Sequence, residues 1–323
     1  MVKTLSVTII GLGNIGMLYD YYKTDSKIRL SHLKSFYYNP KFKVINCIDL
    51  SQEKLDLAKN IYGDKINYYK TFTPKIKETD IYVLCSHPKT NRKYFHEILN
   101  NNNNCFFLVE KPGWKISADY NLSHINEKVY FNYFRKAIPS FQKLKRNIEN
   151  NTFGQIQSVI CYYTKGLKNN GSHLIDLIFY FFGEKVKIET LNVTKSIVDY
   201  DKNDETLSFS LKIEYKKNDI LVNFIGLDEK MYSIIEMDIM AEFSRISIKD
   251  FGGRIIYEEV GEDKLFNGYK KHTKKRFTNS NLSLYGNFVT NHIYKIYFNK
   301  MKNDSGLNNE KNISGLIELI KNF

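Results

Sequence analysis

Short apolar segments alternate with amphipathic ones over the first 110 residues. Four apolar, β-branched runs have the length and composition of buried strands: 5–10, 43–49, 80–86 and 105–110. Three stretches between them have helical spacing: one beginning near Met17, one at 51–63 and one at 91–99. Strands and helices in alternation predict an α/β domain with a doubly wound parallel sheet.

The pattern changes after about residue 133. Single elements come first, a helix near 137–149, a strand at 156–164 and a helix at 172–182. Six further β-rich stretches follow: 186–193, 207–215, 219–227, 232–240, 243–250 and 254–260. Several alternate apolar with polar residues, which is typical of an antiparallel sheet with one covered face. Two helical stretches end the chain, at 283–299 and 315–322. We therefore expect an α/β domain at 1–134 and an α+β domain with a largely antiparallel, open sheet at 135–323.

Composition limits the class of protein. The 323 residues are 42% hydrophobic, 15% aromatic and 26% charged, which fits a folded chain of about two domains and excludes a disordered or collagenous one. No apolar run approaches the roughly 20 residues that span a bilayer, and the start of the chain lacks the apolar core of a signal peptide. A cytoplasmic location is expected, with no membrane partner.

Charge and cysteine content narrow the partners. The formal net charge of +13 suits an anionic partner, such as a nucleotide-linked substrate or a nucleic acid. The basic residues are spread along the chain without a nucleic-acid recognition motif, so no nucleic acid is expected. A denser group at Lys270, Lys271, Lys274, Lys275 and Arg276 either helps to bind a diphosphate or is a solvated face. Four separated cysteines predict reduced, mostly buried thiols and no metal site: Cys47, Cys85, Cys105 and Cys161.

The segment GLGNIG follows the first predicted strand. In a dinucleotide-binding Rossmann domain, Gly11 would allow the tight turn, Gly13 the approach of a pyrophosphate, and Gly16 close packing of helix on strand. Backbone amides at the start of the next helix would bind the phosphate, so Asn14 and Ile15 are also expected to bind the cofactor. The alternative is a plain glycine-rich turn.

An acidic residue follows the second predicted strand. Asp49 would bind both hydroxyls of an adenosine ribose and repel a 2′-phosphate, which favours NAD over NADP. It lies farther from Gly16 than usual, and residues 19–30 look like an insertion. Residues after the later strands are also expected at the cofactor: Ser86, Pro88, Glu110 and Lys111.

Five segments together resemble the Gfo/Idh/MocA family of glucose-fructose oxidoreductase and inositol dehydrogenase relatives. They are GLGNIG, Asp49, VEKP at 109–112, FNYFRKAIP at 131–139 and GSHLIDLIFYFFG at 171–183. The resemblance implies a Rossmann domain followed by an α+β domain that binds substrate and forms oligomers, here a homodimer or homotetramer.

The resemblance also implies catalytic roles. Lys111 would hydrogen-bond the oxygen on the carbon that exchanges hydride, often with a cis bond before Pro112. His173 would move the proton, kept neutral by a helix N-terminus, unless it only caps or packs that helix. Asp176, one turn later, would orient His173, bind a substrate hydroxyl or serve as a structural acid.

Some positions depart from the family pattern or are less certain in role. Asn169 stands where the family has Asp; it keeps hydrogen bonds but cannot accept a proton. Asn132 and Arg135 match a segment that opens the second domain, where the arginine would hold a phosphate or carboxylate. Lys136 is expected to be an exposed charge.

The resemblance implies an NAD(H)-dependent oxidoreductase acting on a ring alcohol or ketone of a sugar, and together with the positive charge it makes a nucleotide-linked sugar the expected substrate. Asn169 leaves open a catalytically silent NAD-binding regulator or scaffold. A reductase for a non-sugar carbonyl or imine is a third reading.

Overall fold

A computed structural model describes residues 3–23, 27–102, 104–113, 123–183 and 188–322. The chain divides into two compact units, Met1–Ala137 with Ser283–Lys311, and Ile138–Leu282 with Asn312–Phe323. The expected α/β and α+β architectures are both confirmed. The first unit also takes in residues 283–311, which the sequence grouped with the second domain, because the helix in this segment buries its apolar face in the first unit's core.

Six parallel strands form the sheet of the first unit, in the order β3-β2-β1-β4-β5-β6. Their bounds are β1 (Leu5–Ile10), β2 (Phe42–Ile48), β3 (Asn67–Tyr69), β4 (Ile81–Leu84), β5 (Phe106–Val109) and β6 (Val129–Phe131). The strand order reverses between β1 and β4. In sheets of this kind, ligands bind at the carboxyl ends of the strands beside such a reversal.

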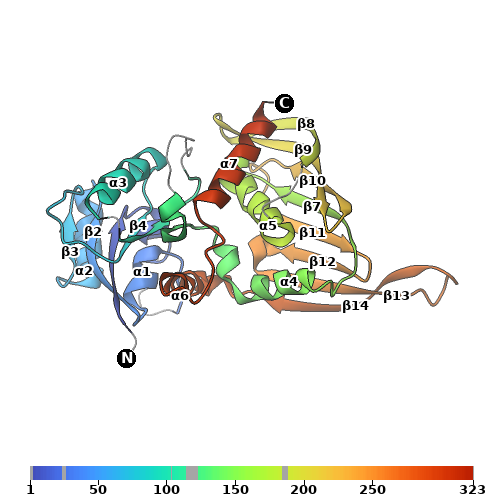
Figure 1. The fold of residues 1–323 in the computed structure, drawn as a ribbon, viewed down its shortest axis with the longest axis horizontal. Coiled ribbons are helices and arrows are strands. Elements are labelled where there is room, and N and C mark those ends of the chain that lie inside the picture. Colours follow the sequence, from blue (N-terminus) through green and yellow to red (C-terminus); the bar gives the residue numbers. More distant parts are fainter. Residues whose placement is uncertain (1–2, 24–26, 103, 114–122, 184–187, 323) are drawn as a thin grey trace. The chain divides into compact units, whose positions relative to one another are not determined.

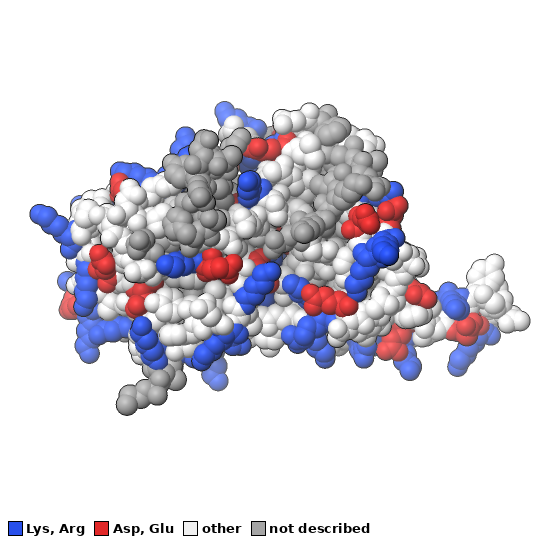
Figure 2. Space-filling model, in the orientation of Figure 1, with Lys and Arg blue, Asp and Glu red and all other residues white. Residues whose placement is uncertain are grey.

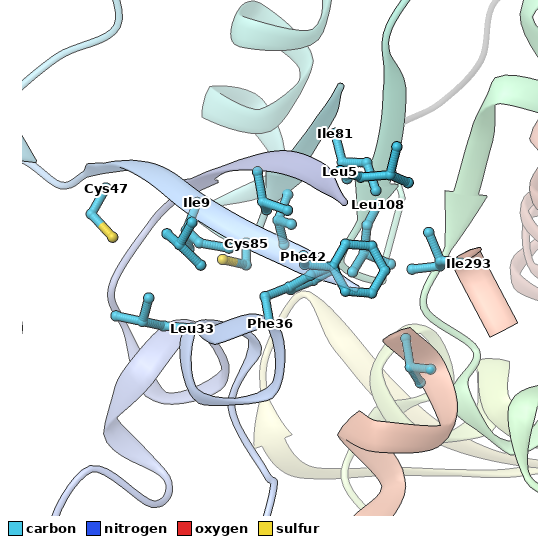
Figure 3. Close-up of a cluster of buried hydrophobic side chains, with 14 of the residues drawn as sticks. Leu5, Ile9, Leu33, Phe36, Phe42, Cys47, Ile81, Cys85, Leu108 and Ile293 are labelled. Atoms are coloured by element: carbon cyan, nitrogen blue, oxygen red, sulfur yellow. The ribbon is translucent and has the colours of Figure 1, made fainter. Parts of the chain in front are cut away.

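Helices cover both faces of this sheet. One face is buried by α1 (His32–Tyr37), α2 (Gln52–Tyr62) and α6 (Tyr285–Tyr297). Figure 3 shows Phe36 of α1 and Ile293 of α6 in this core beside Phe42. On the other face α3 (Pro88–Asn101) places Phe95 against Phe107, with ring centroids 4.7 Å apart. Two short helices also belong to this unit: η2 (Ser123–Lys128) and η3 (Phe134–Ala137). The last helix, α7 (Leu307–Lys321), begins in the first unit and continues into the second from Asn312.

The connection from β1 to β2 differs from the expected one. The helix predicted near Met17 is wrong, because residues there form only η1 (Asn14–Leu18), a single π-helical turn, and α1 begins at His32. Buried Asp20 accepts hydrogen bonds from the Leu30 amide at 2.7 Å and the Ser31 hydroxyl at 2.5 Å. The inserted segment at 19–30 is therefore closed on itself by a buried carboxylate.

The second unit is built on an eight-stranded sheet in the order β14-β13-β12-β11-β7-β10-β9-β8, antiparallel except for the pair β7 and β10. Its strands are β7 (Ile156–Tyr163), β8 (Ile188–Asp201), β9 (Asp204–Tyr215), β10 (Asn218–Gly226), β11 (Ile235–Ala241), β12 (Ser244–Lys249), β13 (Arg254–Glu262) and β14 (Lys270–Asn279). Its helices are α4 (Pro139–Glu149), η4 (Gly166–Gly171), α5 (Ser172–Phe182), η5 (Asp250–Gly252) and η6 (Leu282–Leu284).

Helices α4 and α5 lie on one face of this sheet (Figure 1). Every residue of α5 is buried, and β7 alternates buried with more exposed side chains. This alternation is the pattern that the sequence predicted for a sheet with one covered face. The long hairpin of β13 and β14 extends past the neighbouring strands (Figure 1).

None of the helices in the described ranges is both long and apolar enough to cross a membrane.

Candidate active site

The glycine turn Gly11–Gly16 connects β1 to η1 in the first unit. Gly11 has φ +101°, and a Cβ there would lie 2.8 Å from the backbone of Cys85, so this position requires glycine. A Cβ on Gly16 would lie 2.1 Å from the carbonyl oxygen of Gly11, whereas a Cβ on Gly13 would meet nothing within 4 Å. The first and third glycines therefore allow close packing within the protein, and the second borders open space.

The amides of this turn are available to a ligand. Within the described part of the chain, the N–H groups of Gly13, Asn14, Ile15 and Gly16 make no hydrogen bond. Four successive unpaired amides make a set of hydrogen-bond donors that suits a phosphate. The expected contribution of a helix dipole does not apply, because η1 is a single turn of five residues.

Asp49 lies at the edge of the glycine turn, directly after β2. Its carboxylate accepts hydrogen bonds from the amides of Leu12 at 2.7 Å and Ser51 at 2.9 Å, and Lys54 Nζ lies 3.9 Å away. Two amide donors fix the carboxylate beside the turn. The sequence predicts that this residue binds an adenosine ribose, and in the structure it lies beside the unpaired amides of the glycine turn.

The end of β4 forms the opposite wall of the turn. The Cys85 thiol lies 3.1 Å from the carbonyl oxygen of Gly11. Ser86 follows, and both its amide and its hydroxyl donate to the side-chain oxygen of Asn91, at 3.0 and 2.7 Å. Pro88 is the first residue of α3. The structure therefore brings Ser86 to the glycine turn, with Pro88 beginning the next helix.

A buried polar cluster surrounds Glu110 at the end of β5. Glu110 Oε1 accepts hydrogen bonds from Asn132 Nδ2 at 2.6 Å and lies 2.6 Å from His32 Nε2. His32 is 4% exposed and Asn132 is 3% exposed. The peptide bond between Lys111 and Pro112 is cis, as the resemblance implies. Sequence reasoning missed His32, because its partner Glu110 lies 78 residues away.

Two basic residues after β6 are buried rather than exposed. Lys136 is 1% exposed and donates to the carbonyl oxygen of Asp304 at 2.7 Å, so the expectation of an exposed charge is wrong. Its ammonium joins η3 to the segment before α7 and is thereby kept in the interior. Arg135 is 3% exposed, with its guanidinium 4.6 Å from the ring centroid of Phe134.

The second unit carries the other predicted site residues, on η4 and α5. His173 and Asp176 lie one turn apart on α5 and are 6% and 1% exposed. Asn169 lies in η4, and its amide donates to Asp204 Oδ2 at 2.9 Å. The residue before α5, Gly171, is itself helical, with φ −57° and ψ −37°. His173 is therefore not at a free helix N-terminus, and the argument that such a terminus keeps it neutral does not hold.

Side chains of β8 and β9 hold the backbone that leads to His173. Asp204 also accepts from the Lys168 amide at 2.8 Å, and Thr206 accepts from the Gly166 amide at 2.7 Å. Burial raises the pKa of Asp204 although the amides of Lys168 and Asn169 act in the opposite direction. This internal carboxylate positions the loop at 166–171. No pattern in the sequence around Asp204 predicts this role.

The basic group of the sequence lies on β14, the edge strand of the second sheet, where every residue is exposed. Its charges face acidic residues of the same hairpin: Lys271 lies 2.9 Å from Asp263, Lys275 3.7 Å from Glu258 and Arg276 3.6 Å from Glu259. Figure 2 shows blue and red side chains interspersed along this hairpin. The local geometry is that of a solvated, internally paired face.

All four cysteines are buried and unpaired, as expected: Cys47, Cys85, Cys105 and Cys161. Burial raises the pKa of the Cys105 thiol to about 12. In the described ranges, no cluster of three or more His, Cys, Asp or Glu could hold a metal ion.

Comparison with solved structures supports the fold, whereas the sequence comparisons find no match. No family model matches the sequence, and no curated protein matches it. A solved dehydrogenase (MviM) from Clostridium difficile is 17% identical, with a TM-score of 0.71 over 99% of each chain. The WlbA dehydrogenase from Bordetella pertussis, solved with NADH and UDP-GlcNAcA, is 12% identical with a TM-score of 0.72, over 99% of this chain and 95% of that one.

A third similar structure is KijD10, a 3-ketoreductase from Actinomadura kijaniata solved with NADP. It is 10% identical, with a TM-score of 0.70 over 99% of this chain and 97% of that one. At these identities the likeness establishes a shared two-domain fold.

Proposed function

We propose that this chain is an NAD(H)-dependent oxidoreductase of the Gfo/Idh/MocA type that interconverts a ring alcohol and a ketone of a nucleotide-linked sugar. The observation that carries the proposal is the donor set of Gly13–Gly16, open to a ligand beside the Asp49 carboxylate, where the strand order reverses. The segment Glu110-Lys111-cis-Pro112 directly follows β5, the second strand beyond that reversal.

The residues divide the work as follows. Amides of the glycine turn bind the pyrophosphate, and Asp49 binds the adenosine ribose. Nicotinamide, when bound, accepts or donates the hydride. Lys111 hydrogen-bonds the oxygen of the reacting carbon and stabilises negative charge there, and His173 accepts the hydroxyl proton during alcohol oxidation. Substrate contacts are proposed for Asn132, Arg135, Asn169 and Asp176.

The proposed cofactor is NAD rather than NADP, because a fixed carboxylate at Asp49 repels a 2′-phosphate. We expect NADH to bind at least about tenfold more tightly than NADPH, a difference of about 1.4 kcal/mol. Asp49→Ala should narrow this preference, which titration of both cofactors by fluorescence would measure. Equal affinities in the wild type would contradict the assignment.

The substrate class is supported by two similar structures, one solved with UDP-GlcNAcA and one described as a 3-ketoreductase. The net charge of +13 suits a substrate that carries a diphosphate. We further propose a homodimer or homotetramer formed through the open face of the second sheet, which light scattering on the purified chain would test.

The experiment is a turnover screen. Purified protein is mixed with NAD and UDP-, GDP-, CDP- and dTDP-linked sugars or free sugars, and reduced cofactor is followed at 340 nm. Lys111→Ala is the control, expected to lower kcat by about 10²- to 10³-fold with NADH affinity unchanged. The result against the proposal is absence of turnover in both directions with every substrate.

The alternative is a silent NAD-binding regulator, favoured by Asn169 where the resemblance implies a proton-accepting Asp. Tight NADH binding without turnover would favour it. Restoring turnover with Asn169→Asp would then identify this position as the cause.

A further inference from the structure

Two buried side chains hold the backbone on the two sides of Lys111: His32 contacts Glu110, and Glu310 accepts a hydrogen bond from Gly113. We call His32 and Glu310, with these contacts, the bracket. Among the described residues, the last hydrogen bond that this segment donates to a neighbouring strand is that of the Glu110 amide to the Leu84 carbonyl oxygen, at 2.9 Å, and β5 ends at Val109. The backbone that carries Lys111 therefore lies beyond the strand. The residues on either side of it, Glu110 and Gly113, are hydrogen-bonded to side chains of other elements.

On the N-terminal side, the fixed point is the Glu110 side chain. His32 Nε2 and Asn132 Nδ2 both lie 2.6 Å from the same oxygen, Glu110 Oε1. Hydrogen bonds to an ionised carboxylate are the stronger kind. His32 comes from α1 and Asn132 follows β6, so the residue before Lys111 is tied to two separate elements.

On the C-terminal side, the fixed point is Gly113. Its amide donates to Glu310 Oε1 at 3.1 Å, and the second oxygen of Glu310 accepts from the Tyr133 hydroxyl at 3.0 Å. Glu310 is 3% exposed and lies in the first turn of α7. A Cβ on Gly113 would lie 2.5 Å from Glu310 Oε1 and 2.7 Å from the ring of Phe131, so a side chain at this position would displace one or both of them.

The start of α7 is itself held in place. The Phe131 amide donates to the Ser305 carbonyl oxygen at 2.8 Å, and the Ser305 hydroxyl donates to the Phe131 carbonyl oxygen at 2.8 Å. This reciprocal pair attaches the segment before α7 to β6. The helix turn that carries Glu310 is therefore attached to the sheet beside Gly113.

We propose that His32 and Glu310 are positioning residues for Lys111, which together fix the Glu110–Gly113 segment on both sides of the lysine. The inference rests on the catalytic role proposed for Lys111. An ammonium that must meet the oxygen of a reacting carbon loses about 10²-fold in rate from a displacement of about 1 Å. The bracket prevents such a displacement without touching the substrate.

The first test separates kcat from KM in the full-length protein, with the substrate found in the screen. His32→Gln and Glu310→Gln should each lower kcat about 10-fold or more, and His32→Ala and Glu310→Ala about 10²-fold, while KM and NADH affinity change less than about 3-fold. Glu318→Gln, an exposed glutamate on the same helix α7, is the matched control and should leave all three values unchanged. A kcat within twofold of wild type in both alanine variants would overturn the proposal.

A second arm needs no turnover. Trace labelling with acetic anhydride, analysed by mass spectrometry across pH, reports the reactivity of Lys111 relative to exposed Lys274. Glu310→Ala, His32→Ala and Gly113→Ala should each change this ratio by about threefold or more, and Glu318→Gln should not. The ratio remaining at the wild-type value in all three would overturn the bracket.

The two arms separate the two hypotheses. A changed labelling ratio in a protein without turnover supports the bracket and contradicts the proposed function. Turnover with unchanged kcat and labelling in the variants contradicts the bracket and leaves the proposed function standing. Thermal unfolding followed by circular dichroism confirms that each variant is folded.

Discussion

Two loops of this chain have the same glycine spacing, Gly-Leu-x-Asn-x-Gly, and differ in what their amides bind. Residues 11–16 follow β1, residues 166–171 follow β7, and each loop includes a π-helical turn. The first glycine of each has a positive φ, +101° at Gly11 and +82° at Gly166. The two loops therefore share their glycine spacing and the positive φ of the first glycine, although the π-helical turn begins at Asn14 in one and at Gly166 in the other.

The partners of their amides make them functionally different. In the second loop, Asp204 accepts from the amides of Lys168 and Asn169, and Thr206 accepts from Gly166. In the first loop, Asp49 accepts a hydrogen bond from the Leu12 amide, and the four loop amides that follow Leu12 are unpaired within the described chain. In the second loop, the Asp204 carboxylate thus binds backbone amides of the kind that a phosphate would bind in the first loop. Glycine spacing predicts the loop, and the partners of its amides decide whether it binds an anion.

The largest difference between the loops should appear at their last glycines. An alanine Cβ at position 16 would lie 2.1 Å from a backbone oxygen, whereas at 171 it would lie 3.0 Å from the side chains of Leu167 and Tyr163, a contact that a shift of a few tenths of an ångström relieves. We expect Gly16→Ala to lower the free energy of unfolding by about 3 kcal/mol or more, and Gly171→Ala by less than about 1 kcal/mol. Urea unfolding measures both, and equal losses would contradict the comparison.

The two units should also respond to pH with opposite sign. In the first, burial lowers the pKa of His292 to about 4, so its stabilising contribution is present above the unfolded value of 6.5 and is lost as pH falls through about 4. The loss amounts to about 3 kcal/mol at most. Urea midpoints measured from pH 7 to pH 4 should fall for the wild type and fall less for His292→Phe. Identical slopes would show that this histidine does not titrate on unfolding as proposed.

In the second unit, burial raises the pKa of Asp204 above its ordinary value of 3.8. Its stabilising contribution is therefore present below pH 3.8 and is lost as pH rises through the raised value. In Asp204→Asn, the free energy of unfolding should no longer fall as pH rises above 3.8, which urea unfolding across pH measures. NADH binding should be unchanged, because Asp204 contacts only the second loop. A change in NADH affinity would contradict the claim that only the first loop takes part in cofactor binding.

The smallest effect is expected at the β13–β14 hairpin. Its exposed lysines Lys271, Lys274 and Lys275 are paired with acidic residues of the same hairpin at 2.9 to 3.9 Å. Exposed ion pairs of this kind are worth about 0–1 kcal/mol. Lys274→Ala with Lys275→Ala should change the free energy of unfolding by less than about 1 kcal/mol and leave the KM for a nucleotide-linked sugar unaltered. A large rise in KM would instead assign the basic group to diphosphate binding.

Much of the fold follows from local sequence pattern. The helix predicted at 172–182 coincides with α5, and the strand at 156–164 differs from β7 by one residue. Strand β14 was missed because its alternation of lysines, His272 and threonines carries no apolar signal, and its pairing with β13 is what orders it. The three-residue strands β3 and β6 are too short to show a period.

The candidate site was predictable only where neighbours in sequence build it. The glycine turn, Asp49 and the segment after β5 each lie at the end of a strand, so their positions follow from the strand pattern. His32, Glu310 and Asp204 act through partners 35 to 197 residues away. Such contacts depend on tertiary packing and leave no local pattern. Lys136 was misjudged for the same reason, because its partner Asp304 is 168 residues away.

The central claim is that the turn at 11–16 binds a nicotinamide dinucleotide, and Gly13 tests it most directly. Gly13 has φ −72°, which any residue adopts, and its added Cβ would meet nothing within 4 Å, so Gly13→Ala should fold as stably as the wild type. We predict that NADH titration by fluorescence shows binding to the wild type and at least about tenfold weaker binding to Gly13→Ala, since the methyl group fills the space where the pyrophosphate meets the amides. Lys168→Ala, at the equivalent position of the second loop, should bind NADH as the wild type does. Equal NADH affinity in Gly13→Ala and the wild type, or none in either, would contradict the account.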